Sequence, residues 1–314
     1  MLSPVTRRGW VLFGVMAVIW GIPYFLIRVA VRQMAPAVVV FGRTALAAVV
    51  LLALAQRADA LRPALRRWKP VLAFAIIEMA IPWVLLATAE QHLASGLTGL
   101  LVATVPLVGA IAAFALGDRT ALRPVRLAGI AVGFSGVALL VGNDLSGDGA
   151  PPWWSVALVV VVCVCYGTAP FIVERKLADV PSFGVIAISL SIVTVIYAPI
   201  AAASLPDHRP NINAVLAVLA LAMVCTGLAF VFFFKLLEEV GPARAPLITF
   251  ANPVVAVALG AIFLDEVVTR ATLAGFALVS AGCWLATRPV ASAPHHSLEE
   301  SVVVGAGASG DELR

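Results

Sequence analysis

Two ionisable residues of this sequence stand inside long apolar runs, where a charged side chain is costly. Arg43 lies in the run 36–55, and Glu78 lies in the run 70–91. Such residues are candidates for function by default. A buried carboxyl can bind a proton or anchor a substrate, and a guanidinium can bind a carboxylate or change the proton affinity of a nearby acid. A purely structural ion pair between the two residues is the alternative.

Deep aromatic residues could form the wall of a binding site near these charges. Trp20, Tyr24 and Arg28 recur every four residues and therefore share one helix face. Trp83 and Tyr166 also stand well inside apolar runs. Aromatic residues that anchor a protein at a membrane surface stand near the ends of such runs, so that role does not explain these. Core packing is the alternative to a wall around an amphipathic ligand.

Prolines interrupt five of the apolar runs near their middle. Proline lacks a backbone N–H, so it frees a carbonyl of the preceding turn and kinks a helix. Asn252 stands directly before one of them, and its amide could line the same site. We expect these prolines to mark helix kinks that take part in gating, with kinks that serve packing alone as the alternative. The five are Pro23, Pro82, Pro106, Pro170 and Pro253.

The sequence carries no convincing motif for a metal, a cofactor or an enzyme active site. The four cysteines lie in apolar runs without a neighbouring His or carboxylate. The glycine-rich stretch 305–310 stands four residues before the last residue, so no helix can follow it to hold a pyrophosphate. We predict no metal, no cofactor and no catalytic residue. An intramembrane enzyme would need a catalytic constellation that we do not find, and it remains a weak alternative.

The apolar runs themselves predict an all-α integral membrane protein. The chain is 62% hydrophobic and 12% charged, and a soluble domain carries about twice that charge. The basic residues stand in short loops between apolar runs, which argues against a nucleic-acid partner. The length of the apolar runs indicates that the helices lie in a lipid bilayer. The ten predicted spans are 9–31, 36–55, 70–91, 96–116, 125–142, 153–173, 182–203, 213–237, 243–264 and 271–287.

The distribution of positive charge predicts the orientation of these spans. If the N-terminus is cytoplasmic, most of the 21 Lys and Arg residues fall in inner loops. Arg43 is then in the membrane, and the outer side holds Arg28, Arg32, Arg209 and Arg270. Because positive residues favour the cytoplasmic side, both termini should be cytoplasmic.

The two halves of the chain repeat each other. Residues 127–139 and 273–285 align with a spacing of 146, and Trp20-Gly21 then falls on Tyr166-Gly167. Each half holds five spans, and because five is odd the second half must be inverted. Gly129, Gly133 and Gly136 favour close helix contact, within the chain or in a homodimer. We predict one five-helix repeat over 1–149, a second over 150–287 and a disordered cytoplasmic tail over 288–314.

These features together resemble the EamA-type members of the drug/metabolite transporter superfamily. The resemblance covers about residues 5–287. Helix six departs from the pattern, because Tyr166-Gly167 replaces the usual Trp-Gly. The residues that carry the resemblance are Trp20-Gly21-x-Pro23-Tyr24-Phe25, Pro36 with Arg43, Pro106, Asn252-Pro253, and the acidic residues Asp118 and Asp265-Glu266.

The resemblance implies a basket of ten helices around a central cavity, lined by helices one, three, four, six, eight and nine. It implies a secondary active transporter in a bacterial inner membrane, which exports amino acids or other small metabolites and drugs by alternating access, often with protons as the coupled ion. A nucleotide-sugar or sugar-phosphate carrier of the same superfamily is the main alternative, although it would favour more deep basic residues than Arg43 alone.

Overall fold

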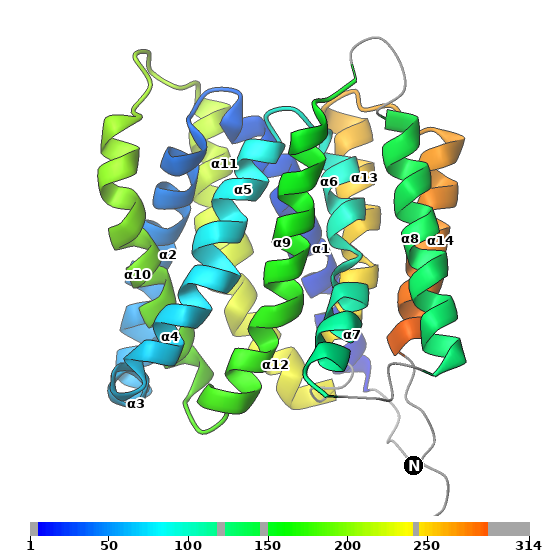
Figure 1. The fold of residues 1–314 in the computed structure, drawn as a ribbon. Coiled ribbons are helices and arrows are strands. Elements are labelled where there is room, and N and C mark those ends of the chain that lie inside the picture. Colours follow the sequence, from blue (N-terminus) through cyan, green and yellow to red (C-terminus); the bar gives the residue numbers. More distant parts are fainter. Residues whose placement is uncertain (1–5, 118–122, 145–149, 241–244, 288–314) are drawn as a thin grey trace, which may run out of the picture.

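The computed structural model describes residues 6–117, 123–144, 150–240 and 245–287, and every regular element in those residues is helical. Figure 1 shows the helices standing side by side in one bundle. Eight helices of the described residues are long and apolar enough to cross a membrane. The shorter α13 and the 18-residue α14 complete the predicted ten. The predicted all-α membrane fold is therefore confirmed. The predicted tail and Asp118 lie outside the described residues.

The first half of the chain forms five spans and one short surface helix. The short helix, α3 (Leu61–Arg66), precedes the third span. The five spans are α1 (Arg7–Val31), α2 (Pro36–Arg57), α4 (Trp68–Phe74) with η1 (Ala75–Ala80) and α5 (Ile81–Ala89), α6 (Ser95–Val102) with α7 (Val105–Ala115), and α8 (Pro124–Asp144).

The second half repeats this plan with a different set of breaks. Its spans are α9 (Trp153–Ile172) with η3 (Val173–Leu177), α10 (Ser182–Ala203), α11 (Ile212–Ala222) with η4 (Met223–Leu228) and α12 (Ala229–Val240), η5 (Ala245–Phe250) with α13 (Asn252–Phe263), and α14 (Arg270–Thr287).

Three of the five singled-out prolines stand where a new helical segment begins. Pro82, Pro106 and Pro253 occupy the first turns of α5, α7 and α13. Proline is tolerated there because its missing N–H would have no partner in a first turn anyway. Pro23 and Pro170 instead lie inside α1 and α9. The fourth and ninth spans are consequently discontinuous, at Ala103-Thr104 and at Ala251.

Two of the three π-helices in the described residues, η1 and η4, occupy matching places in the two halves, which the sequence did not predict. The segment η1 covers Ala75–Ala80 in the third span, and η4 covers Met223–Leu228 in the eighth. Single π-turns inside α-helices are rare and concentrate at functional sites. Their spacing of 148 differs from the 146 that fits the start of each half, and it places Glu78 opposite Thr226.

The last helices of the two halves, α8 and α14, pack along a seam of glycines. A Cβ built on Gly129 would lie 2.7 Å from the carbonyl oxygen of Gly282, and one on Gly136 would lie 2.9 Å from that of Gly275. The seam therefore allows backbone contact that a larger residue would block. Since the earlier glycine of α8 meets the later glycine of α14, the two helices are antiparallel, as an inverted repeat requires.

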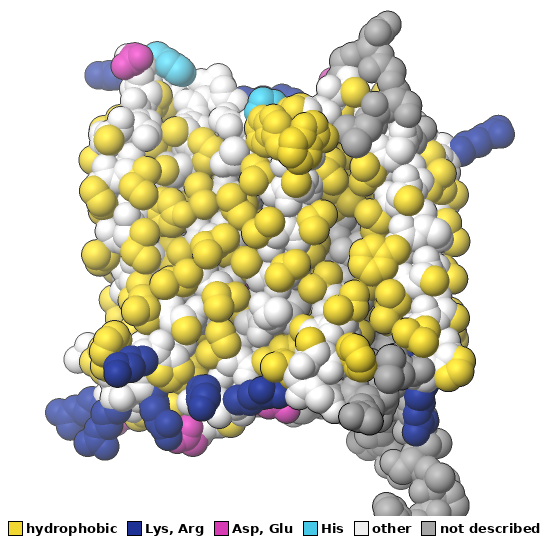
Figure 2. All heavy atoms as spheres, viewed as in Figure 1, with side chains coloured by type: hydrophobic (Ala, Val, Ile, Leu, Met, Phe, Trp, Pro, Cys, Tyr) yellow, Lys and Arg dark blue, Asp and Glu magenta, His cyan; other side chains and the backbone are white. Residues whose placement is uncertain are grey.

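The opposite edge of the bundle is formed by α2 and α10, which are again matching helices of the two halves (Figure 1). Figure 2 shows hydrophobic side chains over the sides of the bundle and Lys and Arg gathered at the end that carries α3. Arg66, Arg67, Lys69 and Lys176 belong to this basic end, where Arg67 also pairs with Asp179 at 2.9 Å. The side that faces lipid and the ends that face water are thus distinct.

Candidate functional site

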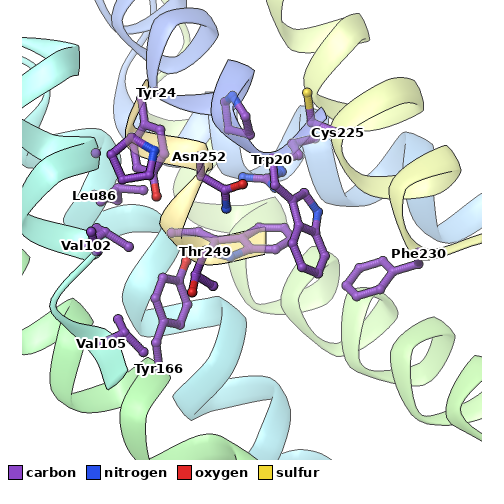
Figure 3. A pocket seen from close by; sticks show the side chains of 16 residues that line it. Trp20, Tyr24, Leu86, Val102, Val105, Tyr166, Cys225, Phe230, Thr249 and Asn252 are labelled. Atoms are coloured by element: carbon purple, nitrogen blue, oxygen red, sulfur yellow. The ribbon is translucent and has the colours of Figure 1, made fainter. Parts of the chain in front are cut away.

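A cavity of about 220 Å³ lies in the middle of the bundle, where both halves meet. Figure 3 shows the side chains that converge on it from seven of the spans. Six of the seven residues that the sequence proposed for substrate or coupling line it, and Glu78 is the exception. The lining residues are Trp20, Pro23, Tyr24, Arg43, Trp83, Leu86, Gly99, Val102, Ala103, Val105, Tyr166, Cys225, Phe230, Thr249, Asn252 and Pro253.

Arg43 supplies the positive charge of this cavity. Its Nε donates a hydrogen bond to Oγ1 of Thr226 over 2.8 Å, and its guanidinium carbon lies 3.7 Å from the ring centroid of Trp83. The Thr226 hydroxyl in turn donates to the carbonyl of Leu221 over 2.8 Å. The planar guanidinium is therefore held by a hydrogen bond along its edge and by a cation–π contact on its face.

Aromatic rings form much of the remaining wall. Trp20 stacks obliquely on Phe233, with ring centroids 4.8 Å apart, and meets the edge of Phe230 at 6.4 Å. Trp20 comes from α1 and both phenylalanines come from α12, so this wall joins the two halves. Tyr24 is buried and Tyr166 is half-buried, and both also line the cavity. Apolar walls with a few placed polar groups are typical of small-molecule sites.

Asn252 ties α1 to the break in the ninth span. With its amide oriented so that it can donate, Nδ2 reaches the carbonyl of Ile248 at 2.9 Å and that of Ala17 at 3.2 Å. Gly21 brings α1 against α13 at the same level, because a Cβ there would lie 2.8 Å from the carbonyl oxygen of Asn252. The discontinuous helix is thus stabilised by a side chain at the cavity, as the irregular backbone of membrane helices requires.

Glu78 does not pair with Arg43 in this structure. It is half-buried on η1, outside the set of residues that line the cavity, and Arg43 bonds Thr226 instead. Its carboxyl interacts electrostatically with Tyr166, which does line the cavity. Of the prolines, Pro23 and Pro253 reach the cavity wall, while Pro82, Pro106 and Pro170 are not among its lining residues.

Sequence reasoning missed several residues of the wall. Leu86, Gly99 and Phe230 carried no signal that separates them from core packing, because each is an ordinary residue of an apolar helix. Thr226, the partner of Arg43 behind the wall, was missed as well; it matches Glu78 only with a repeat spacing of 148, not with 146. That spacing becomes visible only when the two π-helices are aligned.

Comparison with known proteins identifies the family. A family model described as the EamA-like transporter family matches the chain twice, over residues 7–142 and 153–288. The two matches together span most of the sequence. The chain belongs to the EamA-like transporter family. The predicted resemblance to this branch of the drug/metabolite transporter superfamily is therefore confirmed, and the protein is a membrane transporter.

Individual relatives agree with this assignment. The uncharacterized inner membrane transporter YedA of Escherichia coli strain K12 is 29% identical over 246 residues, which cover 77% of this chain and 78% of YedA. An uncharacterized transporter of Archaeoglobus fulgidus is 23% identical over 288 residues, 90% of this chain and 99% of its own length. A solved crystal structure with 21% identity has a TM-score of 0.64 and shares the fold over 89% of this chain and 97% of that one.

The geometry of this EamA-like site suits recognition of a small amphipathic anion. Among the described residues that line the cavity, Arg43 is a cation and none is a carboxylate. Four Nη–H donors, including the pair along the outer edge of the guanidinium, remain for a ligand after Nε has bonded Thr226, because arginine has five N–H donors. An apolar group of the ligand could lie between the indole rings of Trp20 and Trp83. Tyr166 and Asn252 offer hydroxyl and amide groups for a second polar end.

Proposed function

We propose that this EamA-like transporter exports a small carboxylate with an apolar side chain, such as an apolar amino acid. The observation that carries the proposal is Arg43, a desolvated cation held against Trp83 inside an aromatic cavity. A guanidinium fixed in this way can form two parallel hydrogen bonds to a carboxylate. An amino group at the other end of the ligand would find oxygen acceptors on Tyr166 and Asn252.

The size of the cavity supports a small substrate. At about 220 Å³ it is smaller than the roughly 300–1,000 Å³ of sites for drug-sized ligands. A nucleotide sugar is larger than that and carries two phosphates, for which one cation is a poor match. The carrier of nucleotide sugars or sugar phosphates is therefore the weaker alternative.

Alternating access between inverted halves is the mechanism we propose. The cavity lies between the halves, and its aromatic wall and the Arg43–Thr226 hydrogen bond both cross from one half to the other. Inverted halves can exchange conformations, so that the site opens first to one side and then to the other. The basic end of the bundle would face the cytoplasm, with both termini, in a bacterial inner membrane.

Proton coupling completes the proposal, with Glu78 as the carboxyl that the sequence favours. Its half-buried position on a π-helix one element away from the cavity supports such a role, because π-turns often mark functional positions. The electrostatic proximity of Glu78 and Tyr166 would let the charge on Glu78 influence the binding site.

The test is a comparative metabolite profile in a bacterial host. Wild type, Arg43→Gln and Glu78→Gln are expressed at equal membrane levels, and amino acids are measured in medium and cytosol. Arg66→Gln, which changes an exposed arginine on α3, is the matched control. We expect wild type and the control to release the same apolar amino acid, and Arg43→Gln to lose this release. Equal release by Arg43→Gln would remove the basis of the proposal, and equal release by Glu78→Gln would remove the coupling role of Glu78.

A further inference from the structure

A second buried carboxyl, Glu90, lies near the end of the bundle opposite the basic one, just beyond the span Trp68–Ala89. It is completely buried, and both of its carboxylate oxygens lack a hydrogen-bond partner. A buried charge without a partner is strongly unfavourable, and an uncharged carboxyl is much less so. The conformation described here is therefore compatible with Glu90 in its protonated form.

The cations and acids around Glu90 do not neutralise it by direct contact. Arg28 donates from Nη1 to the backbone carbonyl of Glu90 rather than to its carboxylate. The carboxylate of Glu266 is already engaged, because it accepts bonds from the backbone N–H groups of Ser95 at 2.7 Å and Gly96 at 2.9 Å. Burial raises the pKa of Glu90 well above its ordinary value, Arg28 opposes this effect, and the negative charge of Glu266 adds to it.

Glu90 interacts electrostatically with residues that line two different pockets of the protein. Arg28 belongs to the wall of an outer vestibule, together with Arg32, His92 and Glu266. Tyr24, one turn earlier on α1, belongs to the wall of the central cavity. Both Tyr24 and Arg28 are within electrostatic range of Glu90. Glu90 is thus coupled to one residue of the central cavity wall and to one of the vestibule wall.

The same contacts close this end of the bundle. Glu266 precedes α14 and caps the N-terminus of α6, so it joins the last loop of the second half to the first half. His92 packs edge-on against Trp154 of α9, with ring centroids 4.7 Å apart. Opening this end would separate these contacts and let water reach Glu90. Water would stabilise the ionised carboxylate, so ionisation and opening favour each other.

We infer that Glu90 is a proton-binding site that controls the outer end of the transporter. With the proton bound, the end stays closed as in this structure. When the proton leaves, the unpartnered carboxylate favours the conformation in which the vestibule and the central cavity join. This inference rests on the proposed alternating access, and it makes Glu90 a carboxyl through which a proton gradient can act.

Cys225 provides a reporter for this opening, because it lines the central cavity. In a variant with Cys163→Ala, Cys165→Ala and Cys283→Ala it is the sole cysteine. A small, charged, membrane-impermeant thiol reagent is added to the outside of cells at different pH values. The extent of labelling then reports how far the cavity has opened outward, without any transported substrate. This readout separates a failure of the inference from a failure to find the substrate.

The sole-cysteine protein is the parent, and Glu90→Gln is introduced into it. The ionisation of the Cys225 thiol with pH is the same in both proteins, so the ratio of their labelling removes this effect. We expect the ratio of labelling, parent over Glu90→Gln, to rise by up to about tenfold per pH unit until Glu90 is fully ionised. Arg28→Gln should shift this rise to higher pH, because it removes the charge that favours ionisation. A direct comparison of Arg28→Gln with the parent shows the same shift, so it tests the inference even if Glu90→Gln folds poorly.

Other titrating groups face the same region, and the design separates them from Glu90. A labelling ratio that does not change with pH would mean that any pH-dependent opening comes from another group, and it would overturn the inference; His92 and Glu78 are then the groups to substitute. A parent protein whose labelling equals that of Glu90→Gln at every pH would overturn it as well. Among the described residues, the charged or titratable side chains that act electrostatically on Glu90 or line the vestibule are Tyr24, Arg28, Arg32, Arg43, His92, Asp144, Asp265 and Glu266.

Discussion

The guanidinium of Arg43 bonds Thr226, 183 residues further along the chain, through an Nε–Oγ1 contact of 2.8 Å. Arg43 belongs to α2 of the first half, and Thr226 belongs to η4 of the second. The cation at the proposed substrate site is therefore held by both halves. In the proposed alternating access, movement of one half relative to the other would break this hydrogen bond or move Arg43, so it would change the proposed substrate site directly.

Arg43→Lys should separate charge from geometry at this site. Lysine keeps the positive charge but lacks the planar fork that bonds Thr226 and stacks on Trp83. A charged hydrogen bond contributes about 1.5–3 kcal/mol, so we expect the KM for transport to rise roughly tenfold or more. Uptake of the exported amino acid by proteoliposomes measures this. Thr226→Val is the matched control, and it should raise the KM less because the charge of Arg43 and its contact with Trp83 remain.

The glycine seam between α8 and α14 predicts a steric effect. A Cβ on Gly282 would lie 2.3 Å from the backbone nitrogen of Gly133, and neither helix can yield without losing its contact. We expect Gly282→Ala to destabilise the protein by about 1–3 kcal/mol, and thermal unfolding in detergent should show a lower Tm. Gly14→Ala is the control, because nothing lies within 4 Å of its Cβ position. Equal Tm values in the two variants would argue against a tight seam.

The hydrogen bonds of Glu266 predict a separate loss of stability at the end of the bundle opposite the basic one. Its carboxylate accepts hydrogen bonds from Ser95 and Gly96 at the start of α6, where the helix dipole also favours negative charge. Glu266→Ala should therefore cost about 0.5–2 kcal/mol, as the loss of other N-terminal caps does. Thermal unfolding measures the loss, and Glu266→Gln should recover part of it because an amide oxygen can still accept. An alanine variant as stable as wild type would show that this cap contributes little.

The raised pKa of Glu90 predicts how stability changes with pH. Burial raises this pKa above 4.5, so the folded protein binds the proton more tightly than the unfolded chain. The stabilisation is complete below about pH 4.5 and decreases as the pH rises toward the folded-state pKa. We expect it to fall by at most about 1.4 kcal/mol per pH unit in that window. The Tm of Glu90→Gln, measured across the same window, should fall less steeply, and parallel curves for both proteins would contradict the assignment.

The sequence predicted the spans well because their signals are local. Apolar length gave ten helices, and proline positions gave most of their breaks, as with Pro106 and Pro253. Positions such as Trp20 and Asn252 could be singled out because a polar or aromatic group in the middle of a membrane helix is unusual. These properties need no knowledge of which helices are neighbours.

The remaining features depend on contacts between distant segments. Glu90 looks from the sequence like a residue at a helix end, where water would solvate it, but tertiary packing buries it completely, with Arg28 of α1 bonded to its backbone carbonyl. The partner of Arg43 could not be predicted either, since Glu78 and Thr226 occupy matching positions in the two π-helices. Charge made Glu78 the natural choice from sequence, but the packing of α2 against η4 selects Thr226.

The pairing of α8 with α14 also has a consequence for biosynthesis. α14 leaves the ribosome after every other helix in Figure 1, so the glycine face of α8 has no partner while the rest of the chain is being made. Until then this face is open to lipid or to the insertion machinery. Closure of the bundle along this edge therefore has to wait until α14 has been made, and a chain that stops before Arg270 would keep a helix surface that membrane quality control can recognise.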